Sequence, residues 1–364
     1  MPARWPSEMD ARADIMIIGA GIAGASLGAA LAPHAHVMLL EREAHAATHA
    51  TGRSAAIYVR NYGNGVIRAL NEASHAPLAE GGYLSPRGVM TVAREEDRAV
   101  FETEMANSTA EPLTPEEAVA LFPLLRPEAA ACAAIERGAS DIDVDRLVQD
   151  HLRSLRAAGG QVVTGAEITG LAQSERGWEI TWEGGSVRAP VVVNAAGAWA
   201  DEVARMAGER PLGLVPYRRS AAILPMERDP SGWPMLLPAR ETWYAKPEAG
   251  QLMVSPAEED PIAPMDAWAD DMVIAEGLDR FARDVEFEVT RVSHSWAGLR
   301  TFAPDRTPVV GDTGRGFFWL AGQGGYGVQT SPAMAAVARD LILGRRPDLD
   351  PALVAALSPL RDGL

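Results

Sequence analysis

The glycine spacing near the start of the sequence constrains the fold more than any other feature. The stretch "DIMIIGAGIAGASLGAALAPHAHVMLLER" holds Gly19, Gly21 and Gly24 in a G-x-G-x-x-G pattern. A β-branched run precedes these glycines, an alanine-rich run follows them, and a second apolar run ends at Glu41. This order predicts a buried strand, a tight turn, a helix and a second strand, which together bind a dinucleotide.

Each residue of this unit has a physical role. Gly19 would permit the tight turn, Gly21 would let the backbone approach a pyrophosphate, and Gly24 would let the helix pack against the sheet. The helix N-terminus would face the phosphates, and Glu41 would accept hydrogen bonds from ribose hydroxyls. An acid at this position argues against NADP, but the pattern leaves NAD and FAD open. The alternatives are a glycine-rich buried helix or, by hydropathy alone, a membrane anchor over residues 15–32.

A second match to the same pattern lies near the end of the chain, in "FFWLAGQGGYGVQTSPAMAAVARDLIL", at Gly322, Gly324 and Gly327. A second nucleotide site is the alternative here. No strand ending in an acid follows, however, and little sequence remains in which to build a second nucleotide fold. We therefore expect a glycine-lined loop close to a flat ligand, followed by a helix from about Ser331.

Charge and cysteine content exclude several classes of protein. The 364 residues carry a formal net charge of −16, which disfavours nucleic acid as a partner. The single cysteine, Cys132, lies in an alanine-rich run and is expected to be a buried apolar residue rather than a catalytic thiol. No cluster has the spacing of a metal site. The first residues lack the features of a secretory signal, so we expect a cytoplasmic protein with at most peripheral membrane contact.

The rest of the chain continues the alternation of strands and helices, with one interruption. We expect a helix over 144–158, strands at 161–164 and 167–171, then a hairpin and a buried strand ending at Asn194. Residues 212–301 have the alternating pattern of an antiparallel sheet, and residues 112–128 read as short helices broken by proline. A substrate sheet is therefore expected to interrupt the nucleotide domain.

Several motifs resemble one enzyme family in order along the chain, including "GAGIAGAS", "HATGRSAA", "VVNAAGAWAD", "SWAGLRTFAPD" and "GFFWLAGQGGYGVQTSPA". The chain resembles FAD-dependent D-amino-acid dehydrogenases and oxidases of the glycine oxidase and sarcosine oxidase type, most of all the bacterial D-arginine dehydrogenases. The resemblance, rather than the spacing, selects FAD over NAD. No cysteine or histidine matches the family's covalent attachment points, so FAD is expected to be non-covalent.

The resemblance also implies a fold class and its domains. The expected chain is α/β (α+β overall), with a Rossmann-like FAD-binding domain of the glutathione-reductase type and an inserted antiparallel-sheet substrate domain. The FAD-binding domain would comprise residues 12–88, 138–205 and 300–364, and the substrate domain residues 89–137 and 206–299.

The resemblance assigns residues to the cofactor. Arg42 would lie near the adenosine, Arg53 near the pyrophosphate and ribityl chain, and Gln329 near the pyrimidine edge of the isoalloxazine. A solvated surface arginine is the alternative for Arg53. The full expected set is Gly19, Gly21, Ile22, Ala23, Gly24, Glu41, Arg42, Thr51, Gly52, Arg53, Ser54, Ala55, Ala166, Glu167, Ile168, Ala196, Gly197, Trp199, Gly298, Arg300, Gly324, Gly325, Tyr326, Gly327 and Gln329.

The implied reaction is oxidation of a D-amino acid at its α-carbon. A hydride would pass from Cα to the flavin N5, and water would convert the imine to a 2-oxo acid and ammonia. The resemblance implies that Arg300 and then Arg219 hold the carboxylate, since arginine offers a planar fork. It implies that Tyr62 and Tyr244 seat the carboxylate and cover the site. The alternatives are a buried ion-pair arginine and tyrosines of the core.

The sequence departs from the D-arginine enzymes at the side-chain pocket. The acid that pairs with the substrate guanidinium there is replaced by Val89, and a histidine and a threonine by Ile57 and Val59. An unpaired guanidinium would be poorly desolvated, so we expect neutral or apolar substrates rather than cationic ones. A quinone, a dye-like acceptor or oxygen would take the electrons. The rival functions are a glycine- or sarcosine-type amine oxidase and a flavin subunit of an electron-transfer complex.

Overall fold

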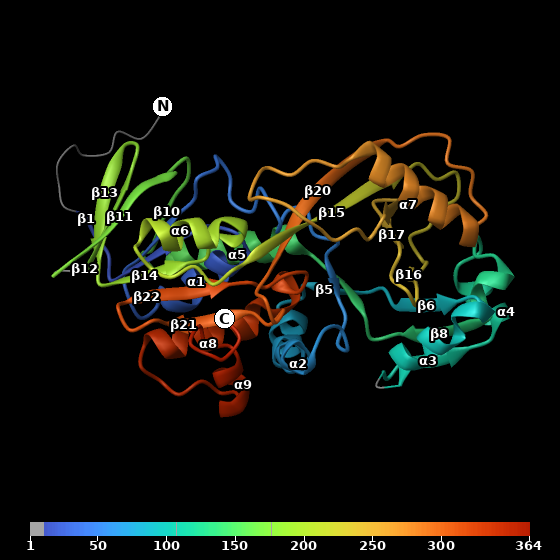
Figure 1. Ribbon diagram of the computed structural model, residues 1–364, viewed down its shortest axis with the longest axis horizontal. Helices are drawn as coiled ribbons and strands as arrows, with labels where there is room; N and C mark the ends of the chain where they lie inside the picture. The colour runs from blue at the N-terminus through green and yellow to red at the C-terminus, as the bar shows by residue number, and fades with distance from the viewer. Residues whose placement is uncertain (1–10, 107, 176) are drawn as a thin grey trace.

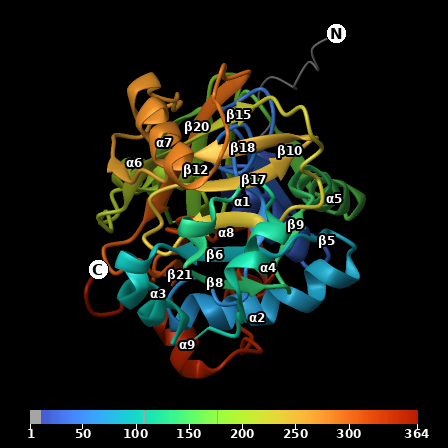
Figure 2. The ribbon, with the colours of Figure 1, turned by 90° about the vertical axis from the view of Figure 1, so that its right-hand side faces the viewer.

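The computed structural model describes residues 11–106, 108–175 and 177–364. Residues 1–10, which bear on the expected lack of a secretory signal, lie outside the described residues. Figure 1 shows two parts side by side: one is a layered arrangement of sheet and helices that carries the C-terminus, and the other is built on a long sheet. Figure 2 views the second part end-on.

The first part is organised by a six-stranded sheet. Its strands contain runs of buried apolar residues, as expected for strands covered on both faces. Neighbouring strands are parallel, except that β21 runs antiparallel to β22. In order, the strands are β10 (Gln161–Val163), β3 (Val37–Leu40), β2 (Ile15–Ile18), β14 (Val191–Asn194), β22 (Phe317–Ala321) and β21 (Val309–Asp312).

Two apolar clusters cover the faces of this sheet. One unites it with α1 (Ile22–Leu31), α5 (Val144–Ala157) and α8 (Gly327–Ile342). The other joins it to α6 (Ala200–Met206) and to a four-stranded sheet. That sheet comprises β1 (Ala11–Arg12), β13 (Gly185–Ala189), β12 (Gly177–Trp182) and β11 (Ile168–Ser174). Within the described ranges, no helix is both long and apolar enough to cross a membrane.

The second part is organised by a nine-stranded sheet that draws on distant segments of the chain. Its long pair, β15 (Val215–Leu224) and β20 (His294–Phe302), is antiparallel and reaches toward the first part (Figure 1). Its other strands are β19 (Asp260–Pro261), β18 (Gln251–Ser255), β17 (Tyr244–Glu248), β16 (Met235–Pro238), β6 (Val89–Ala93), β8 (Cys132–Glu136) and β7 (Glu111–Leu113). The helices α3 (Arg98–Met105), α4 (Pro115–Leu121) and α7 (Asp271–Asp284) belong to the same part.

A small three-stranded sheet and two further helices complete the fold. The sheet contains β4 (Ile57–Tyr58), β9 (Ser140–Ile142) and β5 (Leu84–Pro86), and the helices are α2 (Gly65–Glu80) and α9 (Pro351–Ala356). Segments 89–137 and 206–299 both supply strands to the nine-stranded sheet. The predicted domain boundary between residues 299 and 300 falls inside β20.

Most elements match the sequence-based expectations, and three differ. The C-terminal helix begins at Gly327 rather than near Ser331, and Pro332 lies inside it. Pro332 has no N–H to donate to the Val328 carbonyl, and the Ser331 hydroxyl donates to that carbonyl instead. Glu111–Leu113 is a strand, whereas the expected short helices follow it. The inserted sheet also contains one parallel pair, β6 with β16. Cys132 is buried in β8, as predicted.

Candidate active site

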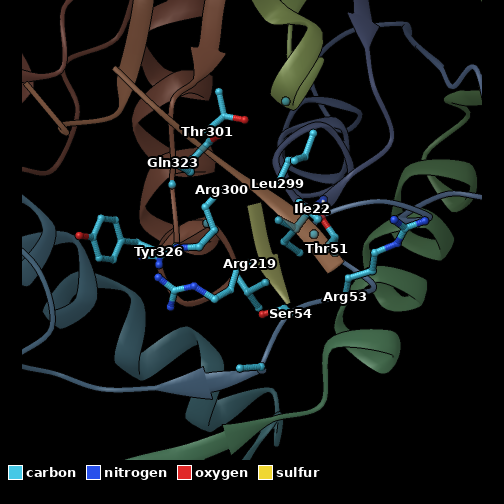
Figure 3. Close-up of a pocket in the computed structure, with 18 of the residues that line it drawn as sticks. Ile22, Thr51, Arg53, Ser54, Arg219, Leu299, Arg300, Thr301, Gln323 and Tyr326 are labelled. Atoms are coloured by element: carbon cyan, nitrogen blue, oxygen red, sulfur yellow. Dashed lines mark hydrogen bonds between the residues drawn. The ribbon is translucent and has the colours of Figure 1, made fainter. Parts of the chain in front are cut away.

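A cavity of about 880 Å³ extends from the carboxyl ends of β2 and β14 to the nine-stranded sheet. Figure 3 shows part of its lining, with Ile22 and Thr51 from the first part near Arg219 and Arg300 from the second. Most of the predicted residues line it: Gly19, Gly21, Ile22, Ala23, Glu41, Arg42, Thr51, Arg53, Ser54, Ala55, Ile57, Val59, Tyr62, Val89, Ala166, Glu167, Ile168, Ala196, Gly197, Trp199, Arg219, Tyr244, Gly298, Arg300, Gly324, Gly325, Tyr326 and Gly327. Gly24, Gly52 and Gln329 are not part of the lining.

Two positions of the β2–α1 unit, one in the turn and one in the helix, have room only for glycine. Gly19 has φ +104°, and a Cβ there would lie 2.5 Å from the Ala195 carbonyl oxygen. A Cβ on Gly24 would lie 1.9 Å from the Gly19 carbonyl oxygen, so this residue serves helix packing rather than ligand contact. Gly21 is the N-cap of α1 and has no side chain to cap the helix. The helix therefore begins at the cavity wall without a cap from its own N-cap residue, a favourable site for phosphate.

Two side chains fix the turn from neighbouring segments. The buried Glu41 carboxylate accepts hydrogen bonds from the backbone N–H of Ala20 at 2.8 Å and of Glu43 at 2.9 Å. Each of its oxygens retains a further acceptor position, which suits a ribose hydroxyl. The Thr51 hydroxyl accepts from the Ile22 N–H at 3.0 Å, which attaches the second glycine-containing loop to the start of α1.

The outer end of this region is formed by a cation and an aromatic ring. The guanidinium carbon of Arg42 lies 4.7 Å from the centroid of the Trp199 ring. The Ala166 N–H donates to the Glu41 carbonyl at 2.8 Å, which brings segment 166–168 to the same edge of the cavity. A flat base would find backbone groups and a cation–π pair here.

Three predicted cofactor residues have other contacts in the structure. The Arg53 guanidinium donates to the carbonyls of Ala267 and Ala297 and pairs with Asp266 at 2.6 Å, and Figure 3 shows it directed away from Arg219 and Arg300. Gln329 is buried and holds the loop that leads to Tyr62, by bonds to the Val59 N–H and the Asn71 amide. Gly52 packs against the Ala47 carbonyl, 2.5 Å from its would-be Cβ.

The residues at this end of the cavity fit FAD. Gly19 and Gly21 line the cavity without side chains, the N-terminus of α1 lies at its wall, and Glu41 offers carboxylate oxygens to a ribose. Thr51 and the Ala166–Ile168 backbone extend the same wall. No group of three or more His, Cys, Asp and Glu residues in the described ranges could hold a metal ion.

At the other end, Arg300 is the central cation. One Nη donates to the Tyr62 hydroxyl at 3.2 Å, and the other lies 3.7 Å from a Glu259 oxygen. Its Nε is buried and has no hydrogen-bond partner among the described residues. A Cβ on Gly325 would lie 2.6 Å from this Nε, so the guanidinium can pack against the loop only because residue 325 has no side chain. The Arg300 Nε therefore still has an N–H that could donate to a bound anion.

Arg219 lies on the same face of the sheet as Arg300. Arg219 is opposite Gly298 and Arg300 opposite Tyr217 in the β15–β20 register, so the two arginines are diagonal neighbours. The Arg219 Nε donates to the Glu258 carbonyl at 2.8 Å, and its guanidinium carbon lies 6.0 Å from the Tyr244 ring centroid. The pair therefore presents two guanidinium groups to one cavity.

Aromatic and apolar side chains surround these arginines. Tyr62 packs edge-on against Tyr326, with ring centroids 5.0 Å apart, and burial together with Tyr62 raises the pKa of Tyr326. A separate apolar cluster includes Val89 and Met235, with four partly buried residues against it: Ile57, Val59, Leu237 and Tyr244. Most of this cluster lines the cavity, which gives it an apolar wall.

Sequence reasoning missed several charged residues of the cavity, among them Glu104, Glu241, Glu259 and Arg306. Burial and the charge of Glu104 raise the pKa of Glu241, against the opposing effect of Arg300 and Arg219. These residues come from loops and from the end of α3, and no motif or spacing marks them. Glu241 and Arg306 adopt positive φ, of 49° and 60°, which no sequence pattern indicates.

Two solved structures that are similar to the chain share its architecture over nearly its whole length. Glycine oxidase from Geobacillus kaustophilus superposes with a TM-score of 0.84 at 22% identity, covering 96% of this chain and 99% of that one. L-proline dehydrogenase from P. horikoshii gives a TM-score of 0.85 at 20% identity, covering 96% and 98%. At these identities the likeness concerns the fold, which is the mixed α/β class predicted from the sequence.

Sequence comparison gives a family and distant relatives. Human mitochondrial dimethylglycine dehydrogenase is 26% identical over 388 residues, which cover 97% of this chain but 44% of that protein. The chain thus spans about half the length of the curated relatives that it matches. The family model described as FAD dependent oxidoreductase matches residues 14–341. The chain therefore belongs to the DAO family of FAD-dependent oxidoreductases.

Proposed function

We propose that this protein oxidises α-amino acids at the α-carbon, to the imine and then by hydrolysis to a 2-oxo acid and ammonia. The preferred substrates in this proposal are D-amino acids with neutral or apolar side chains. One observation carries it: two arginines on one sheet face share a cavity with the glycine turn that fits FAD. A carboxylate bound at the arginines would lie within the same enclosed space as the cofactor.

The chain's own residues would bind and orient the substrate. Arg300 and Arg219 would hold the α-carboxylate, because a guanidinium fork matches a carboxylate in two bonds. The Tyr62 hydroxyl, which already accepts from Arg300, fixes one side of that fork. Tyr244, beside Arg219, would cover the substrate. Fixing the α-carbon in this way can contribute about 7–11 kcal/mol at best.

FAD, when bound, supplies the acceptor for the hydride that leaves the α-carbon. Gly19, Gly21, Glu41 and Thr51 would hold its dinucleotide part, and Gly298 with Gly324–Gly327 would pass beside its ring. The apolar wall excludes water from the reacting atoms while the carboxylate is held. Non-covalent attachment stays a prediction; release of free FAD on acid precipitation would support it.

The apolar cluster around Val89 supports the preference for neutral or apolar side chains. Glu104 and Glu241 in the same cavity favour a second candidate, an amino acid with a cationic side chain. The names of two similar proteins, glycine oxidase and dimethylglycine dehydrogenase, favour a third, a small secondary or primary amine.

The test is anaerobic titration of the FAD-loaded protein with a panel of amines, following the loss of flavin absorbance. The panel contains D- and L-leucine, methionine and phenylalanine, D-arginine and D-lysine, and glycine, sarcosine and dimethylglycine. We expect D-leucine, D-methionine or D-phenylalanine to reduce the flavin fastest. Fastest reduction by D-arginine, by an L-enantiomer or by sarcosine would reject the proposed specificity, and no reduction by any compound would favour an electron-transfer subunit.

The electron acceptor is also part of the proposal. A quinone, a dye-like acceptor or oxygen would reoxidise the reduced protein, and oxygen uptake compared with dye reduction separates an oxidase from a dehydrogenase.

A cytoplasmic location is proposed from the single cysteine, which permits no intrachain disulfide.

A further inference from the structure

The loop between β18 and β19, residues 256–259, reaches both arginines that are proposed to bind the substrate. The Glu258 carbonyl accepts from the Arg219 Nε at 2.8 Å. A Glu259 carboxylate oxygen lies 2.7 Å from an Arg306 Nη and 3.7 Å from an Arg300 Nη. Glu259 therefore bridges two guanidinium groups at the wall of the cavity, and one of them is the central cation.

The position of this loop is fixed by contacts to the strands around it. The Ser255 hydroxyl donates to the Ser220 carbonyl at 2.6 Å, and the Ser220 N–H donates to the Glu258 carboxylate at 2.6 Å. Ala257 adopts φ +55°, a conformation that costs free energy in a residue with a side chain. The loop is thus held in one shape, and Glu259 cannot be regarded as a freely moving surface acid.

Around this loop, more arginines than paired acids line the cavity. Arg219, Arg300 and Arg306 all line the cavity, and Glu259 is the acid that pairs with two of them. Burial of the carboxyl opposes ionisation, but the hydrogen bond from Arg306 and the charge of Arg300 hold the pKa of Glu259 below its ordinary value. Glu259 is therefore a carboxylate at neutral pH. Glu104 and Glu241 also line the cavity, without an ion pair to these arginines in the described residues.

We propose that Glu259 restricts the substrate to a single carboxylate, because its own carboxylate occupies the place beside Arg300 and Arg306 where a second substrate carboxylate would bind. The inference deepens the proposed function and rests on it. With the α-carboxylate on Arg300 and Arg219, an acidic side chain that turned toward Arg306 would meet the charge of Glu259. Like charges brought together in a partly desolvated site are strongly unfavourable.

The experiment compares matched ligands in matched variants. Glutamate and glutamine differ by one charge at nearly equal size, and the enantiomer is the one that reduces the flavin in the panel above. In Glu259→Gln we expect kcat/KM for glutamate to rise at least about tenfold, mainly through KM, and that for glutamine to change less than about threefold. The control is Asp260→Asn, which removes the same charge from the next residue. Asp260 pairs with Arg218 outside the cavity, so kcat/KM should change neither for glutamate nor for glutamine.

A double variant identifies the cation that takes the second carboxylate. In Glu259→Gln/Arg306→Gln, the gain for glutamate should be lost if Arg306 is that cation. Thermal unfolding of each variant checks that the fold is retained. Glu259→Gln keeps the shape of the side chain, and the residue is exposed, so the fold should tolerate it.

Two results would overturn the inference. Equal weakening of glutamate and glutamine in Glu259→Gln would mean that Glu259 only orders the arginines, and unchanged rates for both would mean that it has no part in selection. Failure of the proposed function looks different: the wild-type protein would then be reduced by no amino acid of the panel, glutamine included, and the inference would fall with it.

Discussion

At the scale of the residue, the contacts of the Arg300 guanidinium leave one of its donors available to an acidic ligand. It is held by the Tyr62 hydroxyl on one side and lies against Gly325 on the other, and its Nε has no partner in the described part of the chain. A buried donor without a partner is costly unless a ligand supplies one. Arg300 also lies 3.7 Å from a Glu259 oxygen, and its unpartnered Nε leaves one donor for an acidic ligand in the cavity.

Replacing this guanidinium by an amine gives the first prediction. In Arg300→Lys the two-bond fork is lost, so KM for the preferred amino acid should rise about 10- to 100-fold, corresponding to about 1.5–3 kcal/mol. Steady-state kinetics with an artificial electron acceptor would measure it. Arg218→Lys is the matched control, because Arg218 pairs with Asp260 and does not line the cavity. Similar losses in both variants would contradict a direct role for Arg300.

At the scale of the element, the β2–α1 unit depends on close backbone approach as well as on ligand contact. Gly24 and Gly28 both lie in α1, but their surroundings differ. A Cβ on Gly24 would lie 1.9 Å from a backbone oxygen of Gly19, whereas a Cβ on Gly28 would meet the Leu155 side chain at an ordinary 3.5 Å. The glycine pattern therefore includes a position that serves the helix rather than the phosphates.

The second prediction compares alanine at these two positions. Gly24→Ala should lower the free energy of unfolding by about 3 kcal/mol and reduce the FAD bound per protein, because the turn must move. Gly28→Ala should be neutral or stabilising by up to about 1 kcal/mol, since alanine favours the helix. The flavin-to-protein absorbance ratio and thermal unfolding would measure both effects. Full FAD content in Gly24→Ala would show that the turn tolerates a shift.

At the scale of the whole molecule, a partly buried histidine makes global stability depend on pH. His151 lies on α5, which packs against α1 in the core of the first part. Burial lowers its pKa from 6.5 to about 4, and its Nε2 is without a hydrogen-bond partner among the described residues. Below pH 6.5 the unfolded chain binds a proton at this side chain, and the folded protein does not until about pH 4.

The third prediction follows from that difference. The folded protein should lose stability through His151 as the pH falls from 6.5 toward 4, by about 1–2 kcal/mol at pH 5. His151→Leu removes this contribution, so the variant should gain stability over the wild type at pH 5 compared with pH 7.5. Chemical unfolding of both proteins at the two pH values measures the change. An equal stability difference at both pH values would show that His151 does not titrate between them.

The parts of the candidate site that depend on local backbone geometry are the parts that a sequence can indicate. The glycines, the acid at Glu41 and the strand and helix around them follow from spacing, and the structure brings Ala166, Gly197 and Gly325 to the same cavity. The hydrogen-bond partners of individual side chains cannot be predicted in this way. Gln329 binds Asn71, and Arg53 binds Asp266, because these partners are distant in sequence and neither motif indicates them.

The sequence by itself determined the nucleotide-binding unit, the family and the alternation of strands and helices, because these follow from short-range sterics and from the periodicity of apolar residues. Only the tertiary structure decided which charges share the cavity. Glu104, Glu241, Glu259 and Arg306 come from separate loops and a helix end, and their meeting with Arg219 and Arg300 depends on the pairing of β15 with β20 and on the path of loops between distant strands. Such long-range pairing is set by the packing of the whole chain, and no local pattern encodes it.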